Sequence, residues 1–144
     1  MSKSVFIIFL NIAFGSVALS TTTVTIGSAG DHMYFDKTYF EVKAGSRVKI
    51  LFKNNSTFAE HNLVIVKPGT VQQVVDQGFA ADAKKDFIVE SPNIIAHTRM
   101  LEHGESQILT FKAPTTPEDY PYTCTYPTHA AGMKGVMRVL SISE

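Results

Sequence analysis

Short runs in which apolar and polar residues alternate recur along the chain, and this alternation is typical of β-strands with one buried face. The first run is TTTVTIGS, residues 21–28, which is rich in β-branched residues and places Val24 and Ile26 on one face. The next run, residues 40–56, has a turn at Ala44-Gly45-Ser46 between two alternating halves. We therefore predict a first strand, followed by a hairpin of two further strands.

The later segments continue this pattern, with one interruption. Residues 61–69 predict a short apolar strand, and the strand pattern returns in residues 97–114, 120–126 and 135–142. Between them, apolar residues recur at helical spacing, which predicts a helix from Thr70 to about Lys84. Many short strands with one inserted helical segment predict an all-β fold, an antiparallel sandwich or barrel.

The first twenty residues have the organisation of a secretory signal peptide. Lys3 precedes an apolar stretch, residues 5–13, and small residues follow up to Ser20. A retained membrane anchor is the alternative, but this stretch is shorter than the roughly 20 residues that span a bilayer. We expect a signal peptide over residues 1–20 and one domain over residues 21–144, located in the periplasm or secreted.

Length and charge narrow the classes of function. The chain of 144 residues has room for one domain with a sizeable core. It contains 13 Lys and Arg and 13 Asp and Glu, so its net charge is zero. The only charged residue in the first twenty is Lys3, so their loss would leave a net charge of −1. The basic residues are scattered along the sequence, and we therefore expect no nucleic acid partner.

The single cysteine begins the segment CTYPTHAAGMKG, residues 124–135. One cysteine cannot form an internal disulfide, so Cys124 is buried and inert, joined to another molecule, or used for chemistry. Free cysteines are often simply small buried side chains. The same segment, however, also contains His129 and Met133, whose imidazole and thioether are metal donors.

A second histidine can reach this segment in a sandwich. His61 opens a strand directly after a polar loop, and Cys124 closes a strand directly before one, so both can lie where loops gather at one end. Two imidazoles and a thiolate in a plane, with a long axial thioether, form the blue-copper arrangement, which suits both Cu(II) and Cu(I). We predict that His61, Cys124, His129 and Met133 bind one type 1 copper ion. Met137 is the alternative to Met133, and the spacing within the loop favours Met133.

The sequence resembles the azurin and auracyanin branch of the cupredoxins, small secreted blue-copper electron carriers. The resemblance covers most of residues 22–142, and its most specific parts are HNLVIV, PNIIAHTRMLEHGES and CTYPTHAAGMKGVMRV. It implies a Greek-key β-sandwich or barrel with His61, Cys124 and His129 as equatorial ligands and Met133 as the axial one. It also implies that Asn62 ties the two ligand-bearing loops together, with Thr125 as its partner.

The sequence departs from azurins at two features. Azurins have a glycine before the first ligand, whose carbonyl approaches copper, and this position is Glu60 here. We therefore expect a four-coordinate site. Azurins also have a disulfide, which one cysteine cannot form. Stability must then rest more on a core to which several phenylalanines contribute, namely Phe40, Phe52, Phe87 and Phe111.

We therefore predict an exported electron-transfer protein that cycles its copper between Cu(II) and Cu(I). We expect it to be a monomer and not an enzyme. We expect redox proteins to dock transiently near His129, the ligand that lies in the short loop. A small apolar patch would surround it, formed by Pro127, Ala130, Ala131 and Phe58. Glu60 would add a negative charge at its edge.

Three other functions use the same residues. A copper storage or delivery protein would have the same donors in a more open site, and a copper-free cupredoxin would serve as a binding module. A hydrolase would use Cys124 as nucleophile and a histidine as base. The remaining histidines, His32, His97 and His103, are expected to be solvated side chains in loops or at the surface.

Overall fold

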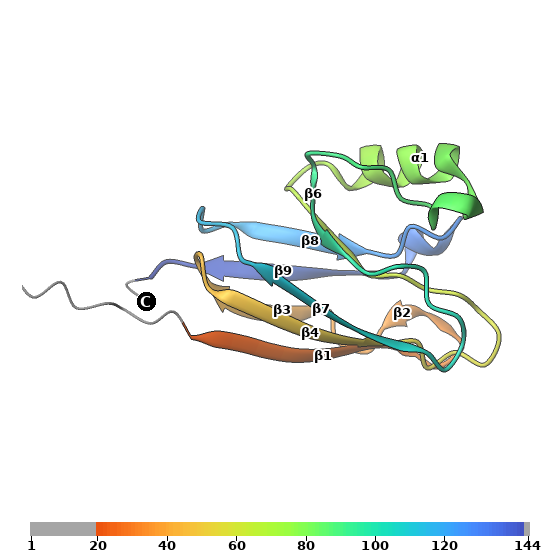
Figure 1. Cartoon of the computed structure of the whole chain (residues 1–144), viewed down its shortest axis with the longest axis horizontal. Coiled ribbons are helices and arrows are strands. Elements are labelled where there is room, and N and C mark those ends of the chain that lie inside the picture. Colours follow the sequence, from red (N-terminus) through yellow and green to blue (C-terminus); the bar gives the residue numbers. More distant parts are fainter. Residues whose placement is uncertain (1–19, 143–144) are drawn as a thin grey trace, which may run out of the picture.

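This computed structural model describes residues 20–142, apart from the side chain of Ala83. These residues contain nine strands, one α-helix and two short 3₁₀ helices (Figure 1). The expected signal peptide lies outside these residues except for Ser20. The elements in chain order are β1 (Thr21–Ala29), β2 (His32–Phe35), β3 (Tyr39–Lys43), β4 (Arg47–Lys53), β5 (Val64–Val66), α1 (Val71–Ala81), η1 (Ala83–Lys85), β6 (Ile94–His97), β7 (Ser106–Lys112), β8 (Asp119–Thr123), η2 (His129–Ala131) and β9 (Lys134–Leu140).

The strands form two sheets that pack face to face. One sheet has the order β2-β1-β4-β7, and the other has the order β3-β9-β8-β5-β6. The all-β sandwich with one inserted helix is therefore confirmed. The sheets are mixed rather than purely antiparallel, because β1 pairs with β4 and β3 with β9 in parallel.

The predicted hairpin of β3 and β4 is wrong, because these strands belong to different sheets. The turn between them carries the chain across the sandwich, with Gly45 at a φ of 68°. Ala44 N donates to Leu140 O in one sheet (2.9 Å), and Ser46 O accepts from Ala113 N beside the other (2.8 Å). Alternation reveals which face of a strand is buried but not which strand lies beside it, so both arrangements fit the same sequence.

The main core lies between the sheets, and it confirms most of the expected aromatic packing. Phe40 and Phe52 are buried there, and Phe111 packs against the same cluster. Phe87 lies elsewhere, against the ring of Tyr126. A second, smaller cluster lies on the outer face of the β5–β6 edge, where α1 covers it. Its buried members are Val64, Val66, Val74 and Ile88.

The helix confirms the predicted element but is shorter. It ends at Ala81 rather than near Lys84, because Asp82 has a φ of 66° and so leaves the helical region. Two strands were missed: β2, whose first residue His32 was placed in a loop, and β6, which is half-buried along its length. No helix among the described residues is long and apolar enough to cross a membrane.

The connection between β8 and β9, residues 124–133, lies at one end of the sandwich, which we call the ligand-loop pole. The N-terminal end of β1 and the turn at Gly45 lie at the opposite end (Figure 1). The fold thus brings Cys124, at the end of β8, and the loop that contains His129 to the same pole.

Candidate metal centre

Three of the four predicted donors lie together in the ligand-loop pole. The Sγ atom of Cys124 is 4.0 Å from His61 Nδ1 and 3.8 Å from His129 Nδ1, and the two Nδ1 atoms are 3.2 Å apart. All three residues are buried. A histidine from before β5 and a cysteine from after β8 therefore meet across 63 positions of sequence.

These separations fit a bound metal ion. The point equidistant from three atoms with these spacings lies about 2.1 Å from each of them. Zinc, a metal of similar size, binds nitrogen and sulfur at about 2.0–2.3 Å. Every angle of the triangle is acute, so that point lies inside it. The three residues can thus hold an ion in their own plane, as a blue-copper centre requires.

The backbone around His61 is fixed by a bridge to Leu101. His61 N donates to Leu101 O (3.1 Å), and Leu101 N donates to His61 O (2.9 Å). The buried amide of Asn54 donates to the same Leu101 oxygen (3.0 Å) and to Ala59 O (2.7 Å). Asn54 thereby holds the loop that precedes His61 against the segment that follows β6.

The loop from Cys124 to Met133 closes on itself through backbone hydrogen bonds. Met133 O accepts from Cys124 N (3.2 Å) and from the Thr123 hydroxyl (2.9 Å), and Met133 N donates to His129 O (2.8 Å). Thr128, next to His129, has a φ of 70°. A β-branched residue rarely adopts this conformation, which marks local strain beside a donor.

Asn62 joins the two segments that carry the donors. Its Oδ1 accepts from Thr125 N (2.8 Å), and its Nδ2 donates to Thr125 Oγ1 (2.7 Å). Both residues are fully buried. This confirms the expected Asn62–Thr125 link, which fixes the residue after His61 to the residue after Cys124.

Burial keeps the donors uncharged in the absence of a metal. It raises the pKa of the Cys124 thiol to about 11, while hydrogen bonds from the backbone N–H groups of Asn62 and Tyr126 act in the opposite direction. Burial, and then the charge of His129, lowers the pKa of His61 to about 4, and burial also lowers the pKa of His129. Three uncharged donors facing one point suit a cation, because binding it requires the loss of only the thiol proton.

Met133 is fully buried beside these donors in the chain, directly before β9. The alternative, Met137, is also buried, but it lies in the middle of β9 opposite Phe40 and Tyr120. Four strand residues span about 13 Å, so Met137 belongs to the core between the sheets. The placement of the two methionines therefore favours Met133 as the thioether of the site.

His129 is the donor that comes nearest to the surface, with 7% of its area exposed against 1% for His61. The ring of Tyr126 packs on its imidazole, with centroids 4.6 Å apart. A hollow of about 460 Å³ opens beside them and is also lined by Phe58 and Glu60. Of the residues expected in the apolar patch, Phe58 lines this hollow and is 72% exposed.

The other histidines are only partly as expected. His32 and His103 are exposed, and His103 lines the same hollow as His129. His97 is half-buried in β6, with Nδ1 3.0 Å from Thr98 O, so it is not a freely solvated side chain. Its strand was not recognised in the sequence.

The sequence interpretation missed two supports of the site. Asp31 accepts hydrogen bonds from Thr57 N (2.6 Å), Thr57 Oγ1 (2.9 Å) and Ser56 Oγ (2.9 Å), which orders the loop before His61. Asn54 was read only as the end of a strand. Asp31 and Asn54 have short polar side chains of the type that often bonds to nearby backbone groups. The sequence does not indicate which distant loop each of them contacts.

Comparisons with known proteins agree with this geometry. A family model described as copper binding proteins of the plastocyanin/azurin family matches residues 22–140. Auracyanin-A from Chloroflexus aurantiacus is 37% identical over 120 residues, which cover 81% of this chain and 74% of that protein. Azurin-1 from Alcaligenes xylosoxydans xylosoxydans is 31% identical over 121 residues, covering 78% and 94%.

Solved structures give the same result. Na-dithionite reduced auracyanin from Roseiflexus castenholzii has a TM-score of 0.79 and 43% identity, covering 85% of this chain and 99% of that one. Auracyanin A, described as a "blue" copper protein from Chloroflexus aurantiacus, also has a TM-score of 0.79, with 35% identity over 84% of this chain and 100% of that one. With its sandwich fold and its buried His, Cys, His triangle, the chain belongs to the copper-binding plastocyanin/azurin family.

Proposed function

We propose that the chain is a blue-copper electron carrier in which His61, Cys124 and His129 bind one copper ion in a plane and Met133 is the weak axial ligand. The observation that carries this proposal is the triangle of two Nδ1 atoms and one Sγ atom, whose centre lies at bonding distance from all three. When bound, copper supplies the one-electron couple between Cu(II) and Cu(I).

The residues of the chain hold this geometry fixed. Asn62 locks the two donor segments together, and the bridge to Leu101 fixes the backbone of His61. The N–H groups that point at the Cys124 sulfur partly neutralise its charge once the proton has left. A site that moves little between oxidation states presents a small barrier to electron transfer.

The partner surface lies at the ligand-loop pole. The edge of His129 beside the exposed Phe58 gives an apolar contact, and Glu60 and Glu102 place negative charges on its rim. A small contact of this kind suits a brief encounter with a redox protein. The rim charges favour partners with basic residues around their own docking site.

Export and the absence of enzyme activity belong to the same proposal. Residues 1–20 would act as a signal peptide, so the carrier would work as a monomer in the periplasm or outside the cell. The proposed metal-binding residues His61, Cys124 and His129 are all buried, which suits electron transfer through the protein edge more than contact with a substrate. Glu60 is not among the described residues with a positive φ, so its side chain causes no such backbone strain. A four-coordinate site remains part of this proposal.

Electron self-exchange tests the carrier role without a known partner. We expect fast exchange between the oxidised and reduced copper protein, measured by NMR line broadening. Phe58→Asp should slow it by more than about 10-fold, because both copies gain a charge in the contact. Ile142→Asp, at an exposed position beyond the far end of β9, is the matched control and should change it little. A slow exchange in the unmodified protein would favour copper storage or delivery.

A further inference from the structure

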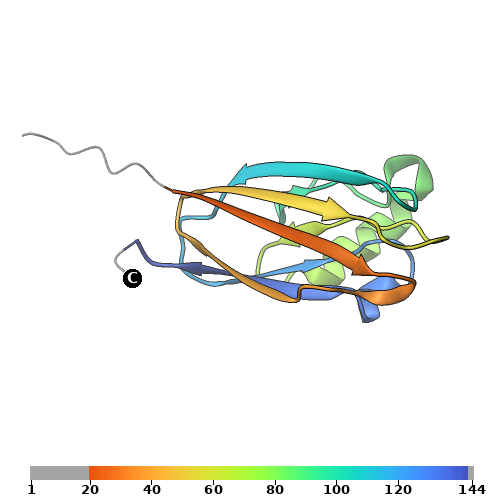
Figure 2. The ribbon, with the colours of Figure 1, turned by 90° about the horizontal axis from the view of Figure 1, so that it is seen from below.

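One face of the sandwich is rich in basic residues, and the acidic residues near it, Glu105 and Asp36, lie at its ligand-loop end. The adjacent strands β1, β4 and β7, all fully described, contain no Asp or Glu. Their basic residues all lie at exposed positions: Arg47, Lys49, Lys53 and Lys112. Figure 2 shows these strands side by side with no other element over them. The chain as a whole is neutral, so this face is a local excess of charge.

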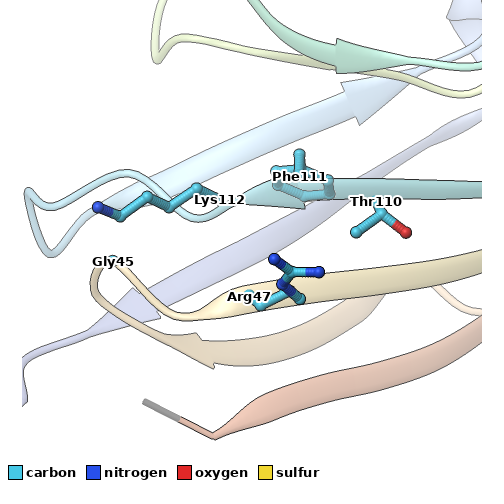
Figure 3. Close-up of a pocket in the computed structure, with 5 residues that line it drawn as sticks. All are labelled: Gly45, Arg47, Thr110, Phe111 and Lys112. Atoms are coloured by element: carbon cyan, nitrogen blue, oxygen red, sulfur yellow. The ribbon is translucent and has the colours of Figure 1, made fainter. Parts of the chain in front are cut away.

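Two of these cations line the same hollow. Arg47 and Lys112 are direct cross-strand partners, a placement that like charges normally avoid. The hollow has a volume of about 430 Å³ and is also lined by Gly45, Thr110 and Phe111. Figure 3 shows Arg47 reaching toward the β7 strand, while Lys112 extends toward the turn at Gly45. The hollow therefore offers two cationic groups to an anion.

These cations are not used within the fold. The ion pairs found among residues 20–142 join Arg99 to Glu105 and Arg138 to Asp119, and neither uses a basic residue of β4 or β7. Glu105, which directly precedes β7, also lines a hollow with Lys53. Between the cations lie Leu51 and Ile108, which are themselves cross-strand partners. Ile108 is 54% exposed. The face thus combines an excess of positive charge with a small apolar centre.

We infer that the outer face of β1, β4 and β7 docks on an anionic lipid membrane, with a lipid phosphate in the hollow between Arg47 and Lys112. The cations extend along β4 for about 20 Å on the outer side of the sheet, which is an extended surface rather than one enclosed site. A charged plane of lipid headgroups complements such a surface.

This orientation has a consequence for electron transfer. The strands of the face run along the long axis of the molecule, from the Gly45 end to the ligand-loop pole (Figure 1). A molecule that lies on this face points its ligand-loop pole sideways, along the membrane surface. His129 would then meet proteins that project from the same membrane, and the carrier would search for them in two dimensions.

Vesicle co-sedimentation tests the proposal directly. Residues 21–144 are the appropriate protein, because all strands lie within them and they correspond to relatives solved as separate chains. At low salt we expect binding to vesicles of equal parts phosphatidylglycerol and phosphatidylcholine, and none to phosphatidylcholine alone. Binding should decrease as sodium chloride is added. Binding to neither vesicle would overturn the proposal and leave an acidic protein as the partner of this face.

Charge reversals locate the binding face. Lys49→Glu with Lys112→Glu should weaken binding at least about 30-fold, since each basic residue near an anionic surface contributes measurably. Lys67→Glu with Lys84→Glu changes the net charge equally, but at exposed positions outside these strands. It should weaken binding far less. Equal losses in both double variants would show attraction by net charge alone and would contradict a specific face.

A fluorescent reporter gives a second readout. The chain contains no tryptophan, so Ile108→Trp places a single reporter at the centre of the face. Its emission should shift to the blue with phosphatidylglycerol vesicles, whereas Phe79→Trp on α1 should not respond. The reverse result would refute the orientation. Copper-free protein serves in all these measurements, so failure of this proposal is distinguishable from failure of the copper site.

Discussion

Asn62 and Thr125 are joined by two buried hydrogen bonds, one from the Thr125 backbone N–H to Asn62 Oδ1 (2.8 Å) and one from Asn62 Nδ2 to Thr125 Oγ1 (2.7 Å). Each residue directly follows a proposed copper ligand, His61 in one case and Cys124 in the other. The link therefore sets the distance between the two donor segments before any metal is bound. A rigid site of this kind changes little when the charge of its metal changes.

Removal of this link should destabilise the protein and loosen the site. Asn62→Ala leaves the Thr125 N–H and hydroxyl buried without partners, and we expect a loss of about 2–4 kcal/mol. Urea unfolding of the copper-free protein measures it. Asn93→Ala, which removes a hydrogen bond to Gln73 at the surface, is the control and should cost less than about 1 kcal/mol. Equal effects of the two substitutions would contradict a structural role for the link.

The helix is held against the ligand loop by a close contact at Gly78. A Cβ atom there would collide with the backbone oxygen of Phe87 and would lie 3.6 Å from the Thr125 Cβ. Gly78→Ala should therefore destabilise the protein by about 2 kcal/mol, although alanine favours helices more than glycine does. Gln73→Ala, at an exposed position of the same helix, removes only the surface hydrogen bond with Asn93 and should cost less than about 1 kcal/mol in the same unfolding experiment. A stabilising effect of Gly78→Ala would mean that the helix packs differently.

Strain at Thr128 can be relieved without touching a donor. Its φ of 70° is costly for a β-branched residue, and its side chain forms no capping hydrogen bond. Asparagine tolerates this conformation, so Thr128→Asn should raise the free energy of unfolding by about 1 kcal/mol. Thermal unfolding with and without copper measures the gain. A loss of stability would indicate that the threonine side chain contributes more than the strain costs.

Acid should weaken the loop that precedes His61. The Thr57 backbone N–H, followed by the Ser56 and Thr57 hydroxyls, lowers the pKa of Asp31 below 3.8. A lowered pKa in the folded state stabilises the protein above the unfolded pKa, and this contribution is lost as the pH falls through the folded value. Asp31→Asn should therefore be less stable than the unmodified protein at neutral pH, and the difference should shrink below about pH 4. A difference that is independent of pH would exclude the ionised carboxylate as its cause.

The donor set could be predicted from the sequence because its chemistry is local. Cys124, His129 and Met133 lie within ten residues, and their types and spacing are specific to one metal geometry. His61 was placed by the same reasoning, at the start of a strand after a polar loop. The triangle in the structure agrees with this, whereas the strand neighbours of β3 and β4 did not follow from alternation.

The properties that depend on pairing between strands could not be predicted. The basic residues Arg47, Lys49 and Lys53 lie at alternate or every fourth position of one strand and so share one face, and Lys112 joins them only because β7 lies beside β4. In the sequence the basic residues are scattered, and this distribution was used only to argue against a nucleic acid partner. Strand pairing over 65 residues of sequence is set by packing of the whole core, which no short pattern contains.

The visible absorption spectrum of residues 21–144 with and without Cu(II), repeated for Cys124→Ser, tests the copper site most directly. We expect an intense thiolate-to-copper band that needs Cys124 and bleaches on reduction, because the Cys124 sulfur lies 4.0 and 3.8 Å from the two imidazole donors and can share one ion with them. Cys124→Ser should keep the fold, as circular dichroism would check, and lose the band. A colourless protein with Cu(II), or a band that persists in Cys124→Ser, would contradict the blue-copper site and the electron carrier with it.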